Sequence, residues 1–116
     1  MDQPDLASVT KKLLDLSTGH IELNDTLILD GYVNRWKEKD MVGVRPPITI
    51  HSYDYGYYIP VPDKDHWHKV ALKQMREDGA SEALVSLIDW CVIRNFALLC
   101  FDRDGLVVEG LPKFEW

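Results

Sequence analysis

The sequence predicts an α+β fold: a mixed or antiparallel sheet of four to five strands with a β-hairpin, packed against three to four helices. Apolar residues recur at helical spacing in three segments between residues 24 and 93. They alternate around a turn in 48–61, and six of them follow one another in 96–101. The first spacing is typical of amphipathic helices, and the other two are typical of strands. With 116 residues, we expect a single domain over residues 1–116.

The first segment combines both patterns. Apolar residues have helical spacing over 6–13, whereas residues 14–18 alternate like a strand that runs into Gly19. We therefore predict a short helix followed by a strand.

The second segment has the features of a helix. Asn24 and Asp25 are residue types that cap helices, and the apolar positions after them follow the i, i+3, i+4, i+7 rule. These positions are Leu29, Tyr32, Val33 and Trp36. We expect this helix to end over 37–40, because Pro46 and Pro47 follow and neither can donate a backbone hydrogen bond.

Residues 48–61 predict the β-hairpin, with Asp54-Tyr55-Gly56 as its turn. Pro60 has no N–H to donate, so its strand should lie at a sheet edge or turn the proline out of the ladder.

Two helices should follow. Asp63 is a candidate N-cap for the first, which we expect to end at Gly79. The apolar face of this helix is predicted from Trp67, Val70, Ala71 and Met75. Ser81 is the predicted cap of the second helix. Its apolar stripe is Leu84, Leu87, Ile88, Cys91 and Val92, with Trp90 and Ile93 on another side. We therefore expect neighbours on more than one side of it.

The apolar run 96–101 predicts a central strand. The Asp-Gly pair that ends Asp102-Arg103-Asp104-Gly105 favours a tight turn, after which residues 106–108 should return as the second strand of a hairpin.

Charge and cysteine content exclude several classes of protein. Thirteen basic against nineteen acidic residues give a net charge of −6, which disfavours general nucleic-acid binding. Cys91 and Cys100 lie in apolar surroundings, and we expect core thiols in a reducing compartment. Residues 1–8 are acidic, and no apolar run is long enough for a signal peptide or a membrane span. We therefore expect a cytoplasmic protein that does not bind membranes.

Four short pieces carry a resemblance. They are Ser17-Thr18-Gly19-His20-Ile21, Asp54-Tyr55-Gly56-Tyr57, Phe101-Asp102-Arg103-Asp104-Gly105 and Gly110-Leu111-Pro112-Lys113-Phe114-Glu115-Trp116. The sequence resembles a family of small uncharacterised proteins carried on bacterial plasmids and integrative elements. The resemblance implies no activity. It implies a bacterial cytosolic protein, an accessory of mobile DNA or a modulator of a host defence system.

Residues 98–106 are similar to the first motif of haloacid-dehalogenase-type phosphatases. That resemblance would make Asp102 a nucleophile and Asp104 an acid or base, with magnesium offsetting their charge. Such enzymes need further phosphate-binding and metal-binding groups downstream, and only eleven residues follow Gly105. We interpret the segment as a turn, and a small metal-dependent phosphohydrolase remains an alternative.

The histidines suggest zinc, with His51 or His20 joining His66 and His68. On a helix, residues two apart point about 200° away from each other, so His66 and His68 cannot share an ion there. Ser17 and Thr18 lie near His20, but no third group to orient a nucleophile is identifiable. We predict no metal site and no cofactor.

Four tyrosines, Tyr53, Tyr55, Tyr57 and Tyr58, are the remaining candidate site. A base-stacking platform would need cations, and no Lys or Arg lies between Arg45 and Lys64. Two interpretations stay open: cross-strand pairs that stabilise the hairpin, or a patch that binds another protein. We predict a small acidic interaction module without enzyme activity. A homodimeric structural module formed through an edge strand or through the hairpin is a further alternative.

Overall fold

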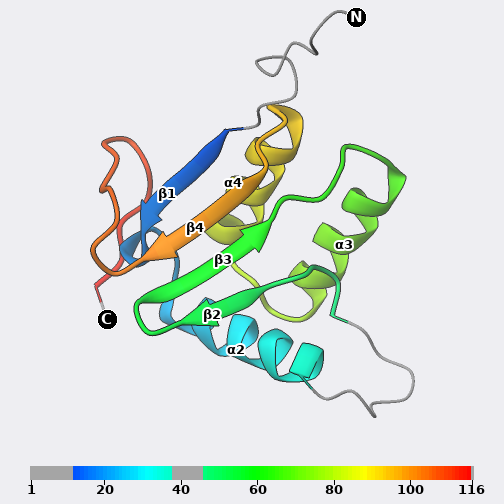
Figure 1. Ribbon diagram of the computed structural model, residues 1–116, viewed down its shortest axis with the longest axis horizontal. Coiled ribbons are helices and arrows are strands. Elements are labelled where there is room, and N and C mark those ends of the chain that lie inside the picture. The colour runs from blue at the N-terminus through cyan, green and yellow to red at the C-terminus, as the bar shows by residue number, and fades with distance from the viewer. Residues whose placement is uncertain (1–11, 38–45, 116) are drawn as a thin grey trace, which may run out of the picture.

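The computed structural model describes residues 12–37 and 46–115, which form four strands, a short 3-10 helix and three α-helices (Figure 1). The elements are β1 Leu13–Ser17, η1 Thr18–His20, α2 Leu23–Lys37, β2 His51–Tyr53, β3 Gly56–Pro60, α3 His66–Glu77, α4 Glu82–Ile93 and β4 Leu98–Asp102. The α+β class is confirmed, as is the strand predicted over 14–18. The helix predicted over 6–13 lies mostly outside the described residues, and Leu13 itself begins β1.

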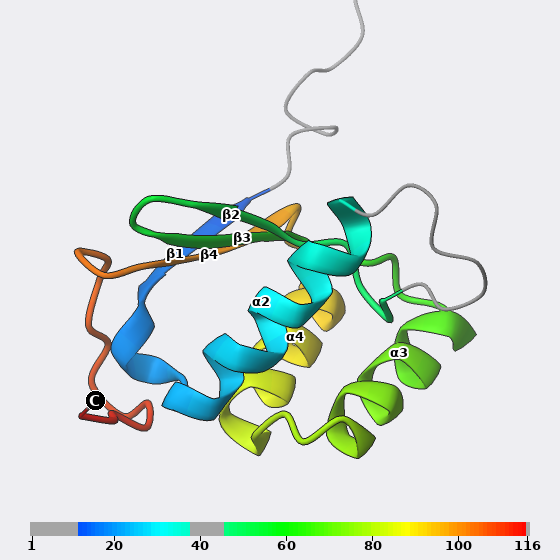
Figure 2. The same ribbon diagram turned by 90° about the horizontal axis from the view of Figure 1, so that it is seen from below.

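The four strands form one mixed sheet in the order β1-β4-β3-β2. β1 is parallel to β4, and the other two pairs are antiparallel. The three α-helices lie on one face of this sheet, and no helix of the described residues covers the other face (Figure 2). β4 is central, as predicted: Leu99 and Phe101 are buried against the helices, whereas Cys100 and Asp102 are half-buried on the uncovered side.

The core lies between the sheet and the helices. Its fully buried members include Leu16, Leu29, Tyr32, Ile59, Met75, Leu84, Ile88, Leu99 and Phe101. Each large apolar side chain removed from water in this way contributes about 1.5–3 kcal/mol to folding. Within the described segments, no helix is long and apolar enough to cross a bilayer.

The predicted return strand after β4 is wrong. β1 and β3 already occupy the two sides of β4, so neither side can accept another strand. The turn does form, because the N–H of Gly105 donates to the carbonyl of Asp102 at 2.9 Å. The chain then reaches the outer edge of β1, where Leu106 makes an isolated parallel bridge with Leu16.

β2 and β3 form the predicted hairpin, joined by Asp54 and Tyr55. β3 is an interior strand, so the edge position considered for it is wrong, but Pro60 does lie outside the β2 ladder. The last pair between the two strands is His51 with Tyr58, and Pro60 extends beyond it. Its missing N–H therefore removes no bond between them.

The N-caps predicted for α2 and α3 are wrong by a few residues. α2 begins at Leu23, so Asp25 lies in its first turn, where its carboxylate accepts the N–H of Glu22 at 2.9 Å. α3 is capped by Asp65 instead of Asp63: the Asp65 carboxylate and the His68 ring each accept the other residue's backbone N–H at 3.1 Å. Each helix has more than one residue near its start that can cap it, and local sequence alone does not choose among them.

The predicted apolar face of α3 is also rotated. Trp67 is 71% exposed and Val70 is 43% exposed. The buried positions are His68, Ala71, Leu72 and Met75, which also obey the i, i+3, i+4, i+7 rule. The helix ends as predicted: Gly79 has φ +103°, and the N–H of Ala80 donates to the carbonyl of Met75 at 2.9 Å, a Schellman ending.

α4 is capped by Ser81 as predicted, since the hydroxyl oxygen accepts the N–H of Leu84 at 3.2 Å. The predicted stripe is buried along its whole length. α4 packs against both α3 and β4, so the expected neighbours on more than one side are confirmed, although Trp90 and Ile93 remain 38% and 51% exposed. Trp90 packs beside Phe96 with ring centroids 5.1 Å apart.

Candidate functional site

The face of the sheet that no helix covers carries a row of chemically distinctive side chains. Asp15 on β1 lies opposite Cys100 on β4, which lies opposite Tyr58 on β3, which lies opposite His51 on β2. Directly paired residues project to the same side of a sheet, so these four side chains share one surface. Asp102 and Tyr53 lie in the next row, on either side of Gly56. We call this surface, together with Tyr55 at the hairpin turn, the open face.

The aromatic rings of the open face form a connected cluster. His51 stacks on Tyr58 with centroids 4.8 Å apart and planes at 23°. Tyr53 lies 6.2 Å from Tyr58 and 6.4 Å from Tyr55. Each of the three tyrosines is at least 36% exposed, so the cluster remains accessible to a partner.

Tyr57 does not belong to this cluster. Its side chain points to the helix-covered face, is only 9% exposed, and donates its hydroxyl to the carboxylate of Asp30 on α2. Strand alternation therefore separates it from Tyr58, its neighbour in sequence. Three of the four tyrosines proposed for binding share one surface, and the fourth is part of the core.

Asp102 organises the end of β4. Its carboxylate accepts the Tyr53 hydroxyl at 2.7 Å and the N–H of Asp104 at 2.8 Å. These bonds, assisted by the nearby Arg103, lower the pKa of Asp102. Partial desolvation and the bond to Asp102 raise the pKa of Tyr53, whose phenol is a hydrogen-bond donor at neutral pH as in any tyrosine. The hairpin and the turn after β4 are thereby held together.

We expect Asp102→Asn to make the thermal stability of the protein less dependent on pH in the acidic range. A carboxyl whose pKa is lowered by folding stabilises the protein above its unfolded pKa, and this contribution is lost as pH falls through the folded pKa. The difference in thermal midpoint between wild type and variant should therefore shrink from pH 7 to about pH 3. Asp104→Asn is the matched control, because the Asp104 carboxylate is exposed and makes only a long 4.0 Å contact with Arg103 among the described residues. A constant difference for Asp102→Asn would contradict the assignment.

Cys100 lies in the middle of the open face, but its surroundings do not activate it. Burial, followed by the negative charges of Asp15 and Asp102, raises the pKa of its thiol. A nucleophilic or metal-binding cysteine needs the opposite environment, one that favours the thiolate. Both Cys100 and Cys91 are free thiols: Cys91 is in the core as predicted, whereas the same prediction for Cys100 is wrong, because strand alternation turns its half-buried side chain to the open face.

The residues proposed for hydrolysis are engaged in structural contacts. Asp102 closes its own turn, as described above, and Asp104 is an exposed turn residue. His20 is 1% exposed, with Nδ1 2.7 Å from the carbonyl oxygen of Pro112 and Nε2 accepting the N–H of Val108 at 2.9 Å. In the described part of the chain no hydrogen bond joins either aspartate to a histidine. His20 thus fixes the C-terminal segment in place.

The other candidate groups are also separate. The Ser17 hydroxyl accepts the N–H of Gly19 and does not contact His20. His68 is buried in the cap of α3, while His66 packs against Trp67. Across residues 12–37 and 46–115, no three His, Cys, Asp or Glu side chains gather closely enough to hold a metal ion.

The open face contains members that sequence reasoning missed. Asp15, His51 and Cys100 are 36 to 85 positions apart along the chain, and only strand pairing brings them into one row. The alternation of each strand could have assigned its side chains to a face, but it does not reveal which strands are neighbours.

Comparison with known proteins identifies the family of this chain. The model described as the C-terminal domain of a family of unknown function, DUF5983, matches residues 13–116. No curated protein and no solved structure matches the chain.

Proposed function

Since the chain belongs to the DUF5983 family of unknown function, we propose its role from its geometry: it is an interaction module that binds a basic surface of another protein. The observation that carries this proposal is the exposed tyrosine cluster on a sheet face that the helices leave uncovered. Solvated sheet faces normally carry polar residues. Three accessible tyrosines there offer the rigid, amphipathic contact area that dominates protein interfaces.

The charges around the cluster favour a basic partner. Asp15 and Asp102 lie on the open face, and the exposed Asp54 and Asp104 lie in the two turns beside it. Arg103 is the cation beside them, and its guanidinium already lies 4.6 Å above the ring of Tyr55. An arginine from a partner could bind the neighbouring rings and carboxylates in the same way, by cation–π contact and charge-assisted hydrogen bonds.

The biological setting rests on the sequence resemblance alone. A bacterial partner connected with mobile DNA or with host defence is a prediction of that resemblance, and the contacts above define only the chemistry of the partner.

The tyrosine cluster can be tested with two substitutions and a matched control. We expect Tyr55→Ser combined with Tyr58→Thr to lower partner binding about tenfold or more, because buried tyrosines are frequent hot spots. Threonine preserves the β-strand preference at position 58. Trp67→Ser, which removes a 71% exposed aromatic from α3, should leave binding unchanged.

The measurement is quantitative cross-linking of wild type and both variants in cell extract at low and high salt. A specific partner should be captured by wild type and Trp67→Ser, lost with the double variant, and weakened by salt. Equal capture by all three proteins, or capture that salt does not weaken, would contradict the proposal.

A further inference from the structure

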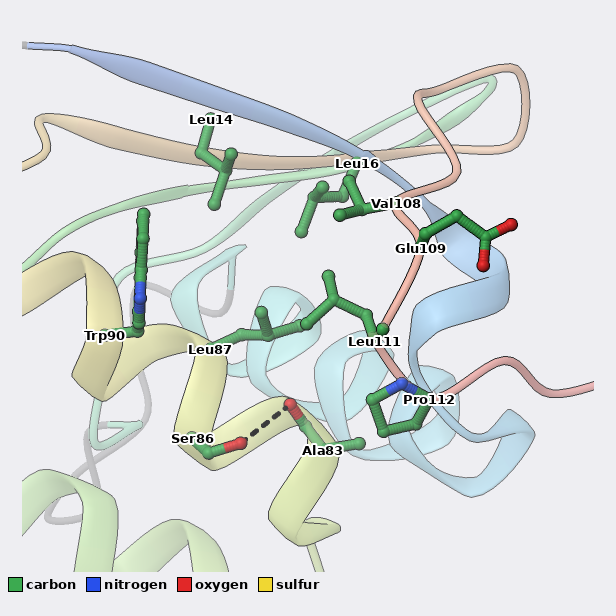
Figure 3. Close-up of a pocket in the computed structure, with 11 residues that line it drawn as sticks. Leu14, Leu16, Ala83, Ser86, Leu87, Trp90, Val108, Glu109, Leu111 and Pro112 are labelled. Atoms are coloured by element: carbon green, nitrogen blue, oxygen red, sulfur yellow. Dashed lines mark hydrogen bonds between the residues drawn. The ribbon is translucent and has the colours of Figure 1, made fainter.

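A second hollow lies on the helix side of β1, away from the tyrosine cluster. A cavity of about 490 Å³ opens between β1, α4 and residues 108–112 (Figure 3). Its walls are mainly apolar, with Trp90 and Leu111 at opposite ends. The Ser86 hydroxyl on its border is occupied, because it donates to backbone carbonyls of its own helix. The cavity is therefore suited to aliphatic or aromatic side chains and has no arrangement for a charged ligand.

This cavity borders the outer edge of the sheet. β1 is the terminal strand, and the N–H of Ser17 points outward and donates to the carbonyl of Leu106 at 2.9 Å. Because backbone groups alternate along a strand, the N–H groups of Leu13 and Asp15 point to the same outer edge. Among the described residues, Leu106 alone bridges to this edge. One end of this edge is thus paired with Leu106 of the chain itself, and at the other end no described residue pairs with it.

We propose that an extended peptide segment of a partner protein, with alternating apolar and basic residues, adds to β1 as a fifth strand. Its main chain would pair with Leu13 and Asp15 in continuation of the bridge made by Leu106. The alternate side chains of an added strand project to opposite faces. Those on the helix side would enter the cavity between Leu14 and Trp90.

Negative charge beside β1 favours basic residues at the positions of the added strand that point away from the helices. Asp15 is exposed, and no ion pair joins it to a basic residue in the described segments. The carboxylate of Glu109 at the rim of the cavity already lies 3.4 Å from the ammonium of Lys113, so the preference for a basic partner rests on Asp15. Lysine or arginine on the outward side of the added strand would lie next to Asp15. This site shares only Asp15 with the open face and does not depend on the tyrosine cluster.

The test uses an acetylated and amidated peptide, Lys-Val-Lys-Leu-Lys-Val-Lys, titrated into the isotope-labelled full chain and followed by NMR. We expect saturable shifts of the Leu13 and Asp15 amides and of the Trp90 indole, with slower hydrogen exchange at Asp15. Ala83→Phe, which adds a ring to the cavity wall, and Asp15→Pro, which removes an outward N–H, should each weaken binding about tenfold.

Two controls separate this site from the open face. The double tyrosine variant should bind the peptide as wild type does, and the same peptide with Glu in place of Lys should not bind. Asp15→Pro keeps the bonds between β1 and β4, since the N–H of residue 15 faces outward. Absence of saturable binding, shifts confined to the tyrosine cluster, or unchanged affinity of Ala83→Phe would overturn the proposal. So would light scattering that shows a dimer of the wild-type chain and a monomer of Asp15→Pro.

Discussion

Gly56→Ala should lower the free energy of unfolding by more than about 3 kcal/mol, the range reached only by severe steric or core defects. Gly56 on β3 lies opposite Asp102 on β4, and a Cβ built on it would overlap the carbonyl oxygen of Phe101. That atom belongs to the backbone of the central strand and cannot move without separating the two strands. The expected result is a large fall in the urea midpoint, measured by circular dichroism.

A second glycine provides the matched control. Gly31 lies inside α2, and a Cβ there would meet no atom within 4 Å. Gly31→Ala should therefore raise the free energy of unfolding by about 0.5–1 kcal/mol, because alanine loses less backbone entropy in a helix. Equal urea midpoints for Gly56→Ala and wild type would show that β3 and β4 are not packed as described.

Asp25→Ala is expected to be the next most damaging change, with a loss of about 3 kcal/mol or more. The carboxylate of Asp25 is fully buried, and it accepts the N–H of Ser81 at 2.8 Å, the Ser81 hydroxyl at 2.6 Å and the N–H of Glu22 at 2.9 Å. Its charge lies at the N-terminal ends of both α2 and α4, where helix dipoles favour an anion. Alanine would leave three donors without an acceptor and a void between the helices.

Two further variants separate hydrogen bonding from charge and volume. Asp25→Asn keeps the shape and one acceptor oxygen, so it should lose less stability than alanine. Asn24→Ala removes an exposed neighbour whose amide makes only a 3.4 Å contact with the carbonyl of Gly79, and it should change stability by less than about 1 kcal/mol. Chemical denaturation of the three variants measures the free energy that each one loses relative to wild type. An equal loss for Asp25→Ala and Asn24→Ala would contradict the role of the buried carboxylate.

The hairpin, the Ser81 cap and the glycine ending of α3 could be predicted because each depends on neighbours in sequence. A serine before an apolar stripe, or a glycine after one, acts through bonds that span a few residues. The continuous apolar run of β4 likewise indicated an interior strand, and the sheet places β1 and β3 on its two edges. The helices α2, α3 and α4, the four strands, and the ends at Ser81 and Gly79 therefore followed from the amino-acid sequence by itself.

Choices between equivalent local patterns were made by tertiary packing. Two apolar stripes with helical spacing are present on α3, one that starts at Trp67 and one that starts at His68. In the structure the stripe that starts at His68 packs on the core. The Asp-Gly turn favoured a hairpin, but β1 took the free side of β4 and Leu106 had to pair elsewhere. Steric exclusion by distant strands thus overrode the local preference.

The candidate site was decided almost entirely by the tertiary structure. The sequence alone showed an acidic chain with a tyrosine-rich hairpin, since composition and alternation need no knowledge of distant contacts. Only the pairing of β1 with β4 and of β4 with β3 placed Asp15 and Cys100 in one row with Tyr58. The same pairing directs the side chain of Tyr57 toward the core. Hydrogen bonds between strands far apart in the chain select these neighbours, and periodicity within one strand cannot specify them.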